Sequence, residues 1–494
     1  MSDLRESGAD GGLSTAAGAV VQPIPRAVWT AASVMALGAF LGNMDGSIVA
    51  VALESMRASL RVGLAEIQWV ATAYLLGLSA ALPLTPWLTR RLGAGRLWLW
   101  AMASFVLTSA LCALAPSAGL LIGARSVQGM TAGVLVAAGQ TVIGLAIGPE
   151  RLGRMMGVLG LVVGLAPIVG PSVGGFLLTR FSWPVLFWLN VPIGVVAVVL
   201  GLRFVPRGER QPPPRMDWLG LALVSAGLPL VVYALTELGT PGSAAQPLYV
   251  ILAAVGLGAV AVFIWWSLRS THPVLHLRLA ARPVMASSLL SVLLGGASIF
   301  GAVLLLPLWF QIRLGSGPAS TGLLLMSLGL GTTAVVAFAG RLADSYGGGA
   351  VALAGSLVVL ASTVPWPWLG PDTPMMLVQA LLFVRGAGLG LSMMPAMTAA
   401  YGSVRPADLG DATALTNIVM RLGGTVGGAL CVIVLSRGLV SGAATGFRGA
   451  FAVLALICAL ATGASAWLRH AERRQREPST INNLDNLDNN SKDI

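Results

Sequence analysis

Long apolar runs, separated by short polar turns, follow one another along almost the whole chain. A helix needs about 20 apolar residues to cross a bilayer, whereas a transmembrane strand needs about half as many. Because only helices and closed barrels satisfy their backbone groups in lipid, runs of this length predict an all-α polytopic membrane protein. We expect fourteen membrane-spanning helices, at residues 27–53, 65–88, 97–117, 119–147, 154–179, 183–203, 216–237, 247–268, 283–310, 318–340, 348–369, 374–400, 411–436 and 447–468.

Two basic segments interrupt the rhythm of these runs, one rich in proline (Arg203–Arg215) and one with an amphipathic pattern (Arg269–Arg282). They divide the runs into groups of six, two and six. The last residues are rich in Asn and Asp, a composition typical of disorder. The expected parts are an N-terminal segment (1–26), a six-helix bundle (27–203), basic linkers with a two-helix insert (204–282), a second six-helix bundle (283–468) and a disordered tail (469–494).

Composition agrees with this pattern: the chain is 56% hydrophobic and 10% charged, and its mean hydropathy is +0.83. The net charge of +11 comes from arginines in short turns rather than from a basic face of a soluble domain, so we exclude nucleic-acid binding. Most of these arginines fall on the side of the N-terminus. By the positive-inside rule we expect a multi-pass protein of the cytoplasmic (inner) membrane with both termini in the cytoplasm.

One carboxylate, Asp45, lies deep inside an apolar run, whereas the other acidic residues fall in loops, in tails or at the ends of runs. Such a placement costs on the order of 2.5–3.5 kcal/mol. Arg125 lies at a similar depth, estimated from a rise of about 1.5 Å per residue. We therefore expect the two charges to interact directly or through water, either as a proton site or as a permanent ion pair between two helices. Intramembrane charges usually line pathways, which favours the first interpretation.

The two halves of the sequence repeat several features. Arg125 in the fourth run is matched by Arg385 in the twelfth, and a glycine-rich fifth run is matched by residues 422–428. Paired halves around a central site are typical of secondary transporters. Two glycine-containing turns on the expected cytoplasmic side also match, with Arg90, Arg91 and Gly93 in the first half and Gly340, Asp344 and Gly347 in the second.

These motifs resemble those of the major facilitator superfamily and, within it, the fourteen-span drug:proton antiporters of the EmrB/QacA type, over residues 27–468. Glycines at this spacing let helices approach closely, although ordinary small-residue packing would use them too. In the first-span motif MDGSIVAVAL the aspartate is Asp45. The other matching residues are Gly164, Pro167, Gly170, Pro171, Gly174 and Gly175 of the antiporter motif and Arg125, Gln128 and Gly129 of the fourth-span motif.

The departures from the family pattern affect two expectations. The resemblance implies that the two glycine-containing turns are cytoplasmic gating turns. Arg90 stands where the family usually has an acid in the first gating turn, so a charge pair made by that acid is absent or rebuilt. In the first span, Ala50 replaces the usual asparagine, which removes a possible substrate contact.

The resemblance implies the major facilitator fold and proton-coupled export of drugs or other hydrophobic cations by alternating access, with Asp45 and Arg125 as the proton-coupling pair. Other residues are candidates for the cavity wall, although such residues more often serve plain packing. Arg385 and Arg421, near the midplane, either meet an anionic group or bond to neighbouring helices, and we favour the second slightly. The cavity candidates are Gln68, Trp69, Tyr74, Gln140, Met393, Met394, Met397, Arg385 and Arg421.

The alternative functions are a narrow-specificity exporter of a metabolite or self-made antibiotic, a channel, and an intramembrane enzyme. The sequence contains no HExxH or GxSxG motif and no intramembrane acid pair, so we do not expect an enzyme. We expect no cofactor or metal, and take His272 and His276 as solvated and the three cysteines as packing residues. The expected partners are the bilayer, a small-molecule substrate and protons. The protein is expected to work as a monomer, with a periplasmic adaptor left open by the EmrB resemblance.

Overall fold

The computed structural model describes residues 26–147, 155, 166, 169–170, 173–210, 212, 215–238, 247–316 and 318–476. All the regular elements among them are helices. The first half contains α1 (Arg26–Leu60), α2 (Leu64–Ala81), α3 (Thr85–Leu92), α4 (Ala94–Ala113), α5 (Ala118–Ile147) and α7 (Pro184–Phe204), followed by α8 (Trp218–Leu238) and α9 (Pro247–Arg269). The second half contains α10 (Pro283–Leu314), α11 (Pro318–Tyr346), α12 (Gly348–Thr363), α13 (Met375–Gly402), α14 (Leu409–Leu439) and α15 (Ala443–Arg476).

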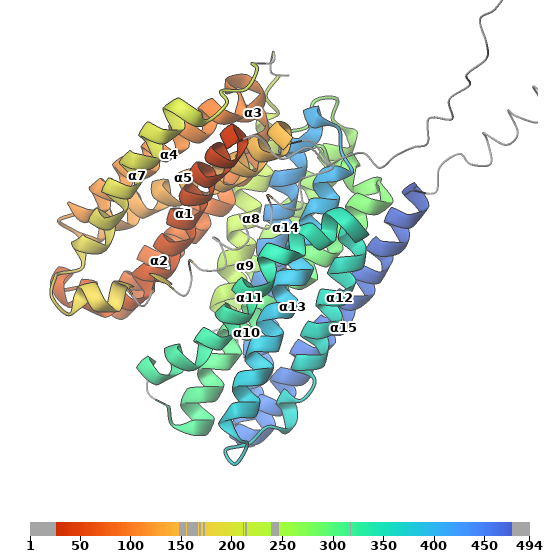
Figure 1. The fold of residues 1–494 in the computed structure, drawn as a ribbon. Helices are drawn as coiled ribbons and strands as arrows, with labels where there is room; N and C mark the ends of the chain where they lie inside the picture. The colour runs from red at the N-terminus through yellow and green to blue at the C-terminus, as the bar shows by residue number, and fades with distance from the viewer. Residues whose placement is uncertain are drawn as a thin grey trace, which may run out of the picture.

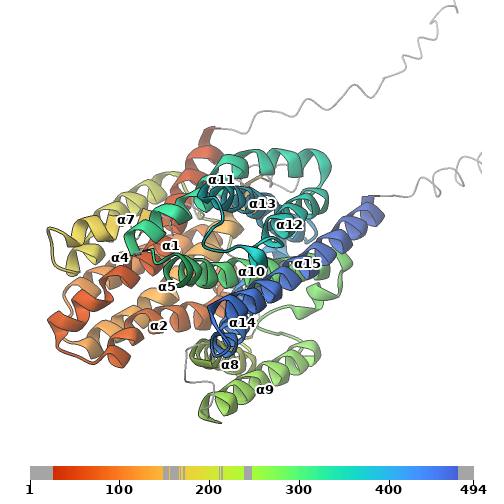
Figure 2. The same cartoon turned by 90° about the horizontal axis from the view of Figure 1, so that it is seen from below.

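The helices gather into two bundles, one from each half of the chain, and this confirms the predicted fold class (Figure 1). The bundles meet where α14 packs against α3 and α5, and they diverge toward the opposite end. Helices α8 and α9 pack on each other at one side, as Figure 2 shows, and α8 also contacts α2 and α14. The insert therefore touches both bundles.

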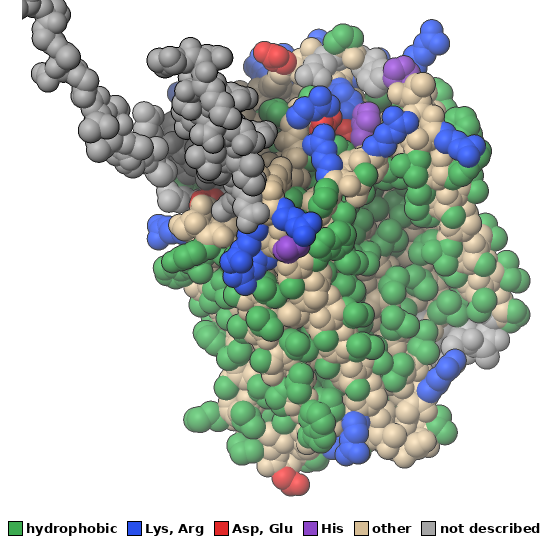
Figure 3. Space-filling view, turned by 90° about the vertical axis from the view of Figure 1, so that its right-hand side faces the viewer, with side chains coloured by type: hydrophobic (Ala, Val, Ile, Leu, Met, Phe, Trp, Pro, Cys, Tyr) green, Lys and Arg blue, Asp and Glu red, His purple; other side chains and the backbone are tan. Residues whose placement is uncertain are grey.

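Within the described residues, twelve helices are long and apolar enough to cross a membrane, and α11, bent by 45°, can be counted as a thirteenth. The predicted span at 154–179 lies largely outside the described residues, so the number fourteen is not confirmed. Hydrophobic side chains cover the flanks of the molecule and charged side chains gather at its ends (Figure 3). This distribution is what a bilayer-embedded bundle requires.

The two predicted gating turns have the same backbone conformation. Gly93 precedes α4 with φ +84°, and Gly347 precedes α12 with φ +92°. A side chain is strained at such angles, and a Cβ at Gly93 would also lie 2.7 Å from the carbonyl oxygen of Arg207. The repeat read from the sequence is therefore present in the local geometry of the fold.

Glycines also bring the equivalent helices of each half together. In the second half, a Cβ at Gly423 would overlap the carbonyl oxygen of Leu293 on α10, and one at Gly427 would lie 2.5 Å from Ala297 Cα. In the first half, a Cβ at Gly170 would overlap Ser47 Oγ on α1. The antiporter-motif segment thus lies against α1 as α14 lies against α10.

The other motif residues separate into two groups. A Cβ at Gly174 would lie 2.6 Å from a side-chain carbon of Ile48, so Gly174 also faces α1, whereas Gly175 faces open space. Gly164, Pro167 and Pro171 lie outside the described residues.

The predicted disordered tail begins too early. Helix α15 continues from the last span to Arg476 because Leu468 and Ala471 are buried and Glu472 accepts a hydrogen bond from the backbone NH of Gly349 at 2.8 Å. Residues 469–476 are therefore helical, and the rest of the predicted tail lies outside the described residues.

Candidate functional site: a buried carboxylate network and a charged gate

Asp45 on α1 and Arg125 on α5 form an ion pair, Oδ2 to Nη1, in the interior of the first bundle. Both side chains are fully buried, with no solvent exposure. Small residues allow the helices to approach closely here: a Cβ at Gly129 on α5 would overlap the carbonyl oxygen of Tyr74 on α2, and one at Gly42 on α1 would lie 3.6 Å from Ala132 Cβ on α5. The expected proximity of the two charges is present, and their role in proton coupling stays a prediction.

Neutral donors complete the shell around the carboxylate. Asn190 on α7 donates to Asp45 Oδ1 at 2.7 Å and also to Ser109 Oγ at 3.1 Å. Gln128 donates to the same oxygen of Asp45 at 3.4 Å and accepts from Arg125 Nη1 at 2.9 Å. Gln128 of the fourth-span motif thus touches both charges.

Asn190 was not predicted as a site residue, although it lies within the predicted span at 183–203. The signal was available: an amide in the middle of an apolar run needs a hydrogen-bond partner when it is buried. Its partners come from α1 and α4, and this could not be read from the sequence.

The guanidinium of Arg125 is held from the side opposite to Asp45. Its Nε donates to the carbonyl oxygen of Val70 at 3.2 Å, and its carbon atom Cζ lies 4.2 Å from the centre of the Tyr74 ring. Tyr74 in turn donates from its hydroxyl to the carbonyl oxygen of Gly42 at 2.6 Å. Tyr74, a cavity candidate, is therefore part of the wall of this charge network.

Two opposing effects act on the Asp45 carboxylate. Burial favours the neutral acid, whereas the guanidinium and the amide donors favour the carboxylate. Protonation of Asp45 would leave Arg125 as an unpaired buried cation, which is costly. Proton binding and the packing of α1, α5 and α7 are therefore energetically linked.

Arg385, the counterpart of Arg125 in the second half, has neutral partners only. Its Nη2 donates to the carbonyl oxygen and the hydroxyl of Ser298 on α10, at 3.0 and 2.9 Å, and its Nη1 donates to Thr363 Oγ1 on α12. Arg385 is 1% exposed and bonds to neighbouring helices, the arrangement that the packed interpretation predicts.

A second buried carboxylate lies at the end of the molecule where the bundles meet. Asp411, in the first turn of α14, is fully buried, accepts from Arg90 Nη1 on α3 at 2.8 Å and contacts His276 Nδ1 at 3.1 Å. The backbone NH of His276 also donates to Asp411 Oδ1 at 3.2 Å. We call Arg90, Asp411 and His276 the gate cluster.

The gate cluster corrects two predictions. Asp411 was treated as a residue at the end of an apolar run, but α3 and the linker before α10 cover it. His276 is not simply solvated: its hydrogen bond with Asp411 raises its pKa, against an opposing effect of partial burial. The charge pair of the first gating turn is rebuilt, with the arginine on α3 and the acid on α14. His272 is exposed, as expected.

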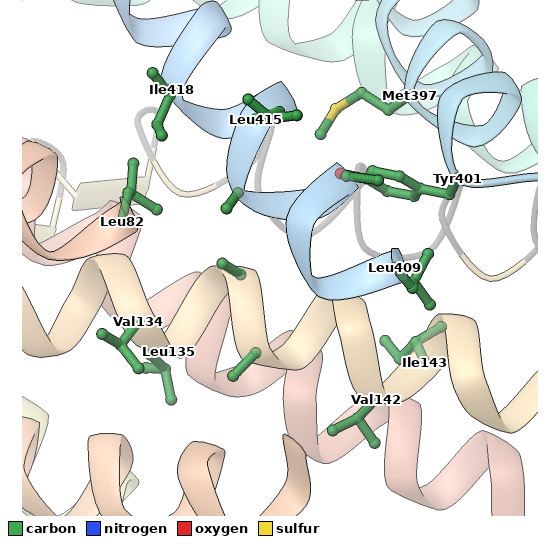
Figure 4. Packing of buried hydrophobic residues seen from close by; sticks show 14 of the residues in the cluster. Leu82, Val134, Leu135, Val142, Ile143, Met397, Tyr401, Leu409, Leu415 and Ile418 are labelled. Atoms are coloured by element: carbon green, nitrogen blue, oxygen red, sulfur yellow. The ribbon is translucent and has the colours of Figure 1, made fainter. Parts of the chain in front are cut away.

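Polar and apolar contacts close the bundles together around the gate cluster. Asn417 and Tyr401 both donate to Gln140 Oε1, at 2.7 and 3.2 Å, and the hydroxyls of Thr141 and Thr413 lie 2.9 Å apart. Figure 4 shows the apolar part of this interface, where the α5 helix faces α14; the labelled residues are Leu82, Val134, Leu135, Val142, Ile143, Met397, Tyr401, Leu409, Leu415 and Ile418. Gln140 therefore bridges the two bundles.

The remaining candidates do not share one cavity. Gln68 and Trp69 are exposed, and Trp69 stacks on Tyr233 of α8 with ring centres 5.2 Å apart. Met393 and Met397 are buried in the core and Met394 is partly buried. Arg421 differs from all of these because it lines a cavity of about 330 Å³ between the bundles.

The other residues of the gating turns and the three cysteines lie in different surroundings. Arg91 lies over the Trp87 ring at 5.0 Å, Gly340 is buried and Asp344 is partly buried. All three cysteines are free and buried, in agreement with a packing role. The described residues contain no cluster of potential metal ligands.

A model of the Major Facilitator Superfamily matches residues 35–428 of the chain. The chain is 30% identical over 410 residues to a multidrug resistance protein B homolog of Mycobacterium tuberculosis, covering 82% of this chain and 76% of that protein. It is 27% identical over 423 residues to the lincomycin resistance protein LmrB of Listeria monocytogenes, covering 85% of this chain and 88% of that protein. Among solved structures, the proton:xylose symporter XylE is similar, with a TM-score of 0.65, 13% identity and coverage of 88% and 94%.

Proposed function

The chain belongs to the major facilitator superfamily, whose members are membrane transporters of small molecules and not enzymes, and from this premise we propose that it is a drug:proton antiporter. It would export drugs or other hydrophobic cations across the cytoplasmic membrane, with both termini in the cytoplasm. The names of the multidrug and lincomycin resistance relatives support export of drugs.

The observation that carries the proton coupling is the fully buried ion pair of Asp45 and Arg125. A proton that binds Asp45 removes the attraction to Arg125, so the packing of α1 against α5 and α7 changes with protonation. When the carboxylate becomes accessible, a cationic substrate competes with the proton for it. Exchange follows because the two cations cannot occupy the carboxylate together.

The gate cluster supplies the second element of alternating access. It holds α3 and α14 together at one end of the molecule, which the arginine distribution predicts to be the cytoplasmic end. The bundles diverge at the opposite end (Figure 1). In this conformation the protein would accept protons from outside, and opening toward the cytoplasm requires separation of Arg90 from Asp411.

The proposal is tested by proton release from purified protein on addition of ethidium, followed with a pH-sensitive dye in weakly buffered detergent solution. We expect wild-type protein to release protons and Asp45→Asn to release none. Glu54→Gln is the matched control, because Glu54 lies on the same helix but is exposed and pairs with Arg57 only. Proton-coupled ethidium export that persists in vesicles containing the Asp45→Asn protein would contradict the proposal.

A further inference from the structure

Arg421 is a cation near the middle of α14, and its side chain makes no hydrogen bond or ion pair with the residues that the structure describes. It lies roughly 18 Å along the helix axis from Leu409, at about 1.5 Å per residue, far from either end. Its Nε is buried and makes no hydrogen bond, and no carboxylate of the described residues forms an ion pair with the guanidinium. Arg421 is partly buried, and an unpaired charge that is partly removed from water is costly, so a group that supplies an anion gains affinity here.

The cavity next to Arg421 has the shape and lining of a small-molecule site. Its volume is about 330 Å³, at the lower end of the usual range for ligand pockets. Helices α2, α8, α10 and α14 all contribute to its wall. The lining is mostly apolar, as the side chains of Leu75, Phe300 and Leu304 illustrate.

The hydroxyl groups of this wall are already occupied. Ser79, Thr236 and Thr425 each donate to a backbone carbonyl of their own helix, at 2.9, 2.7 and 3.0 Å. The guanidinium is therefore the one group among the described lining residues that offers free, charged donors to a ligand.

We propose that this cavity is a binding site for a hydrophobic monoanion, whose carboxylate or equivalent oxyanion pairs with Arg421 and whose apolar body fills the space between α2, α8, α10 and α14. The planar guanidinium suits a carboxylate because it can donate two parallel hydrogen bonds. The inference rests on the proposed function only in treating the anion as cargo, and it gives the protein a second substrate class opposite in charge to the one expected at Asp45.

The position of the cavity distinguishes it from the other buried arginines and from a lipid-headgroup site. Arg385 donates hydrogen bonds to Ser298 and Thr363, and Arg125 pairs with Asp45, whereas the side chain of Arg421 makes no hydrogen bond with the described residues and lines the cavity. The phosphate of a bilayer lipid lies near the ends of the spans, and Arg421 lies near the midplane. A fatty acid that enters from the bilayer and an aromatic acid that enters from water share the required chemistry.

The test is equilibrium dialysis of 1-naphthaleneacetate against purified full-length protein in phosphatidylcholine nanodiscs. We expect the acid to bind at least about tenfold more tightly than its neutral amide, 1-naphthaleneacetamide, the difference that one charge-assisted hydrogen bond supplies. Arg421→Gln should remove this preference, and Arg421→Lys should retain part of it. Arg437→Gln is the control, because it removes one charge from an exposed position at the end of the same helix.

The outcomes separate the two proposals. Equal binding of acid and amide to wild-type protein overturns the inference, whatever the variants do, and leaves ethidium-driven proton release untouched. An acid preference that depends on Arg421 supports it, even if no proton coupling is found. Displacement of the acid by oleate indicates a ligand from the bilayer, and absence of displacement indicates a ligand from water.

Discussion

The two bundles of this transporter share a helix arrangement but differ in the partner of one buried arginine. In both bundles a glycine-rich segment lies directly against the first helix: Gly170 contacts Ser47 of α1, and Gly423 contacts Leu293 of α10. In the first bundle the arginine meets Asp45, and in the second it meets the hydroxyl of Ser298. The two bundles therefore share a buried arginine, and the first bundle adds a carboxylate to it.

The largest expected effect comes from exchanging these partners. Asp45→Ser gives the first bundle the partner of the second, and we expect ethidium-driven proton release to fall to background. Ser298→Asp gives the second bundle a carboxylate, and we expect proton release to persist because Asp45 is intact. Proton release abolished by Ser298→Asp in folded protein, or retained by Asp45→Ser, would contradict the assignment of coupling to the first bundle.

Loss of the buried arginine should lower the free energy of unfolding more in the first bundle than in the second. Arg125→Gln leaves Asp45 as an unpaired buried carboxylate, and breaking such a pair costs about 3–5 kcal/mol. Arg385→Gln breaks hydrogen bonds to neutral groups only, at about 1–3 kcal/mol. Thermal unfolding in detergent should rank wild type above Arg385→Gln and that variant above Arg125→Gln; the reverse order of the two variants would show that the ion pair is not the tighter constraint.

The glycine contacts give a smaller contrast. Gly423→Ala would place a methyl group against the backbone oxygen of Leu293, which cannot move alone, whereas Gly170→Ala would meet the side chain of Ser47, which can rotate. Overpacking costs typically about 1–3 kcal/mol, and we expect Gly423→Ala near the upper value. The unfolding midpoint measures both, with Gly175→Ala as the control because nothing lies within 4 Å of its Cβ position. A control as destabilised as Gly170→Ala would reject the packing explanation.

The smallest effect concerns pH and the gate cluster. The hydrogen bond with Asp411 raises the pKa of His276, and Arg90 and Asp408 also act on it. A raised folded-state pKa means that the charged contact is fully present below the unfolded value of about 6.5 and is lost as pH rises through the folded value. The test uses spin labels at Arg91→Cys and Gly402→Cys in a variant without the native cysteines. We expect the distance between the labels to lengthen slightly as pH rises through the folded-state pKa of His276, because the charged contact is then lost. In His276→Gln the distance should not depend on pH.

The hydropathy pattern and the cost of a buried charge predicted most of what positions the site. They located the spans, Asp45 and Arg125 because each of these follows from one local property of the chain. Asp411 was not predicted because its burial is supplied by α3 and the linker before α10, which are distant in sequence. The sequence could not distinguish Arg385 from Arg421, because both are expected near the midplane. Only the packing of their neighbours decides that Arg385 donates hydrogen bonds to other helices and that Arg421 makes none with the described residues.

Each bundle also contains a thiol beside its arginine. Cys112 donates to Gln128 Oε1 at 3.4 Å, and Cys458 lies 3.9 Å from Arg385 Nη1. Both thiols are buried, so an alkylating reagent reaches either one only when its bundle opens. The unmodified protein thus contains in each half a cysteine whose alkylation rate reports the opening of that bundle. Alkylation rates at Cys112 and Cys458, measured with and without substrate, would show which bundle loosens first during the transport cycle.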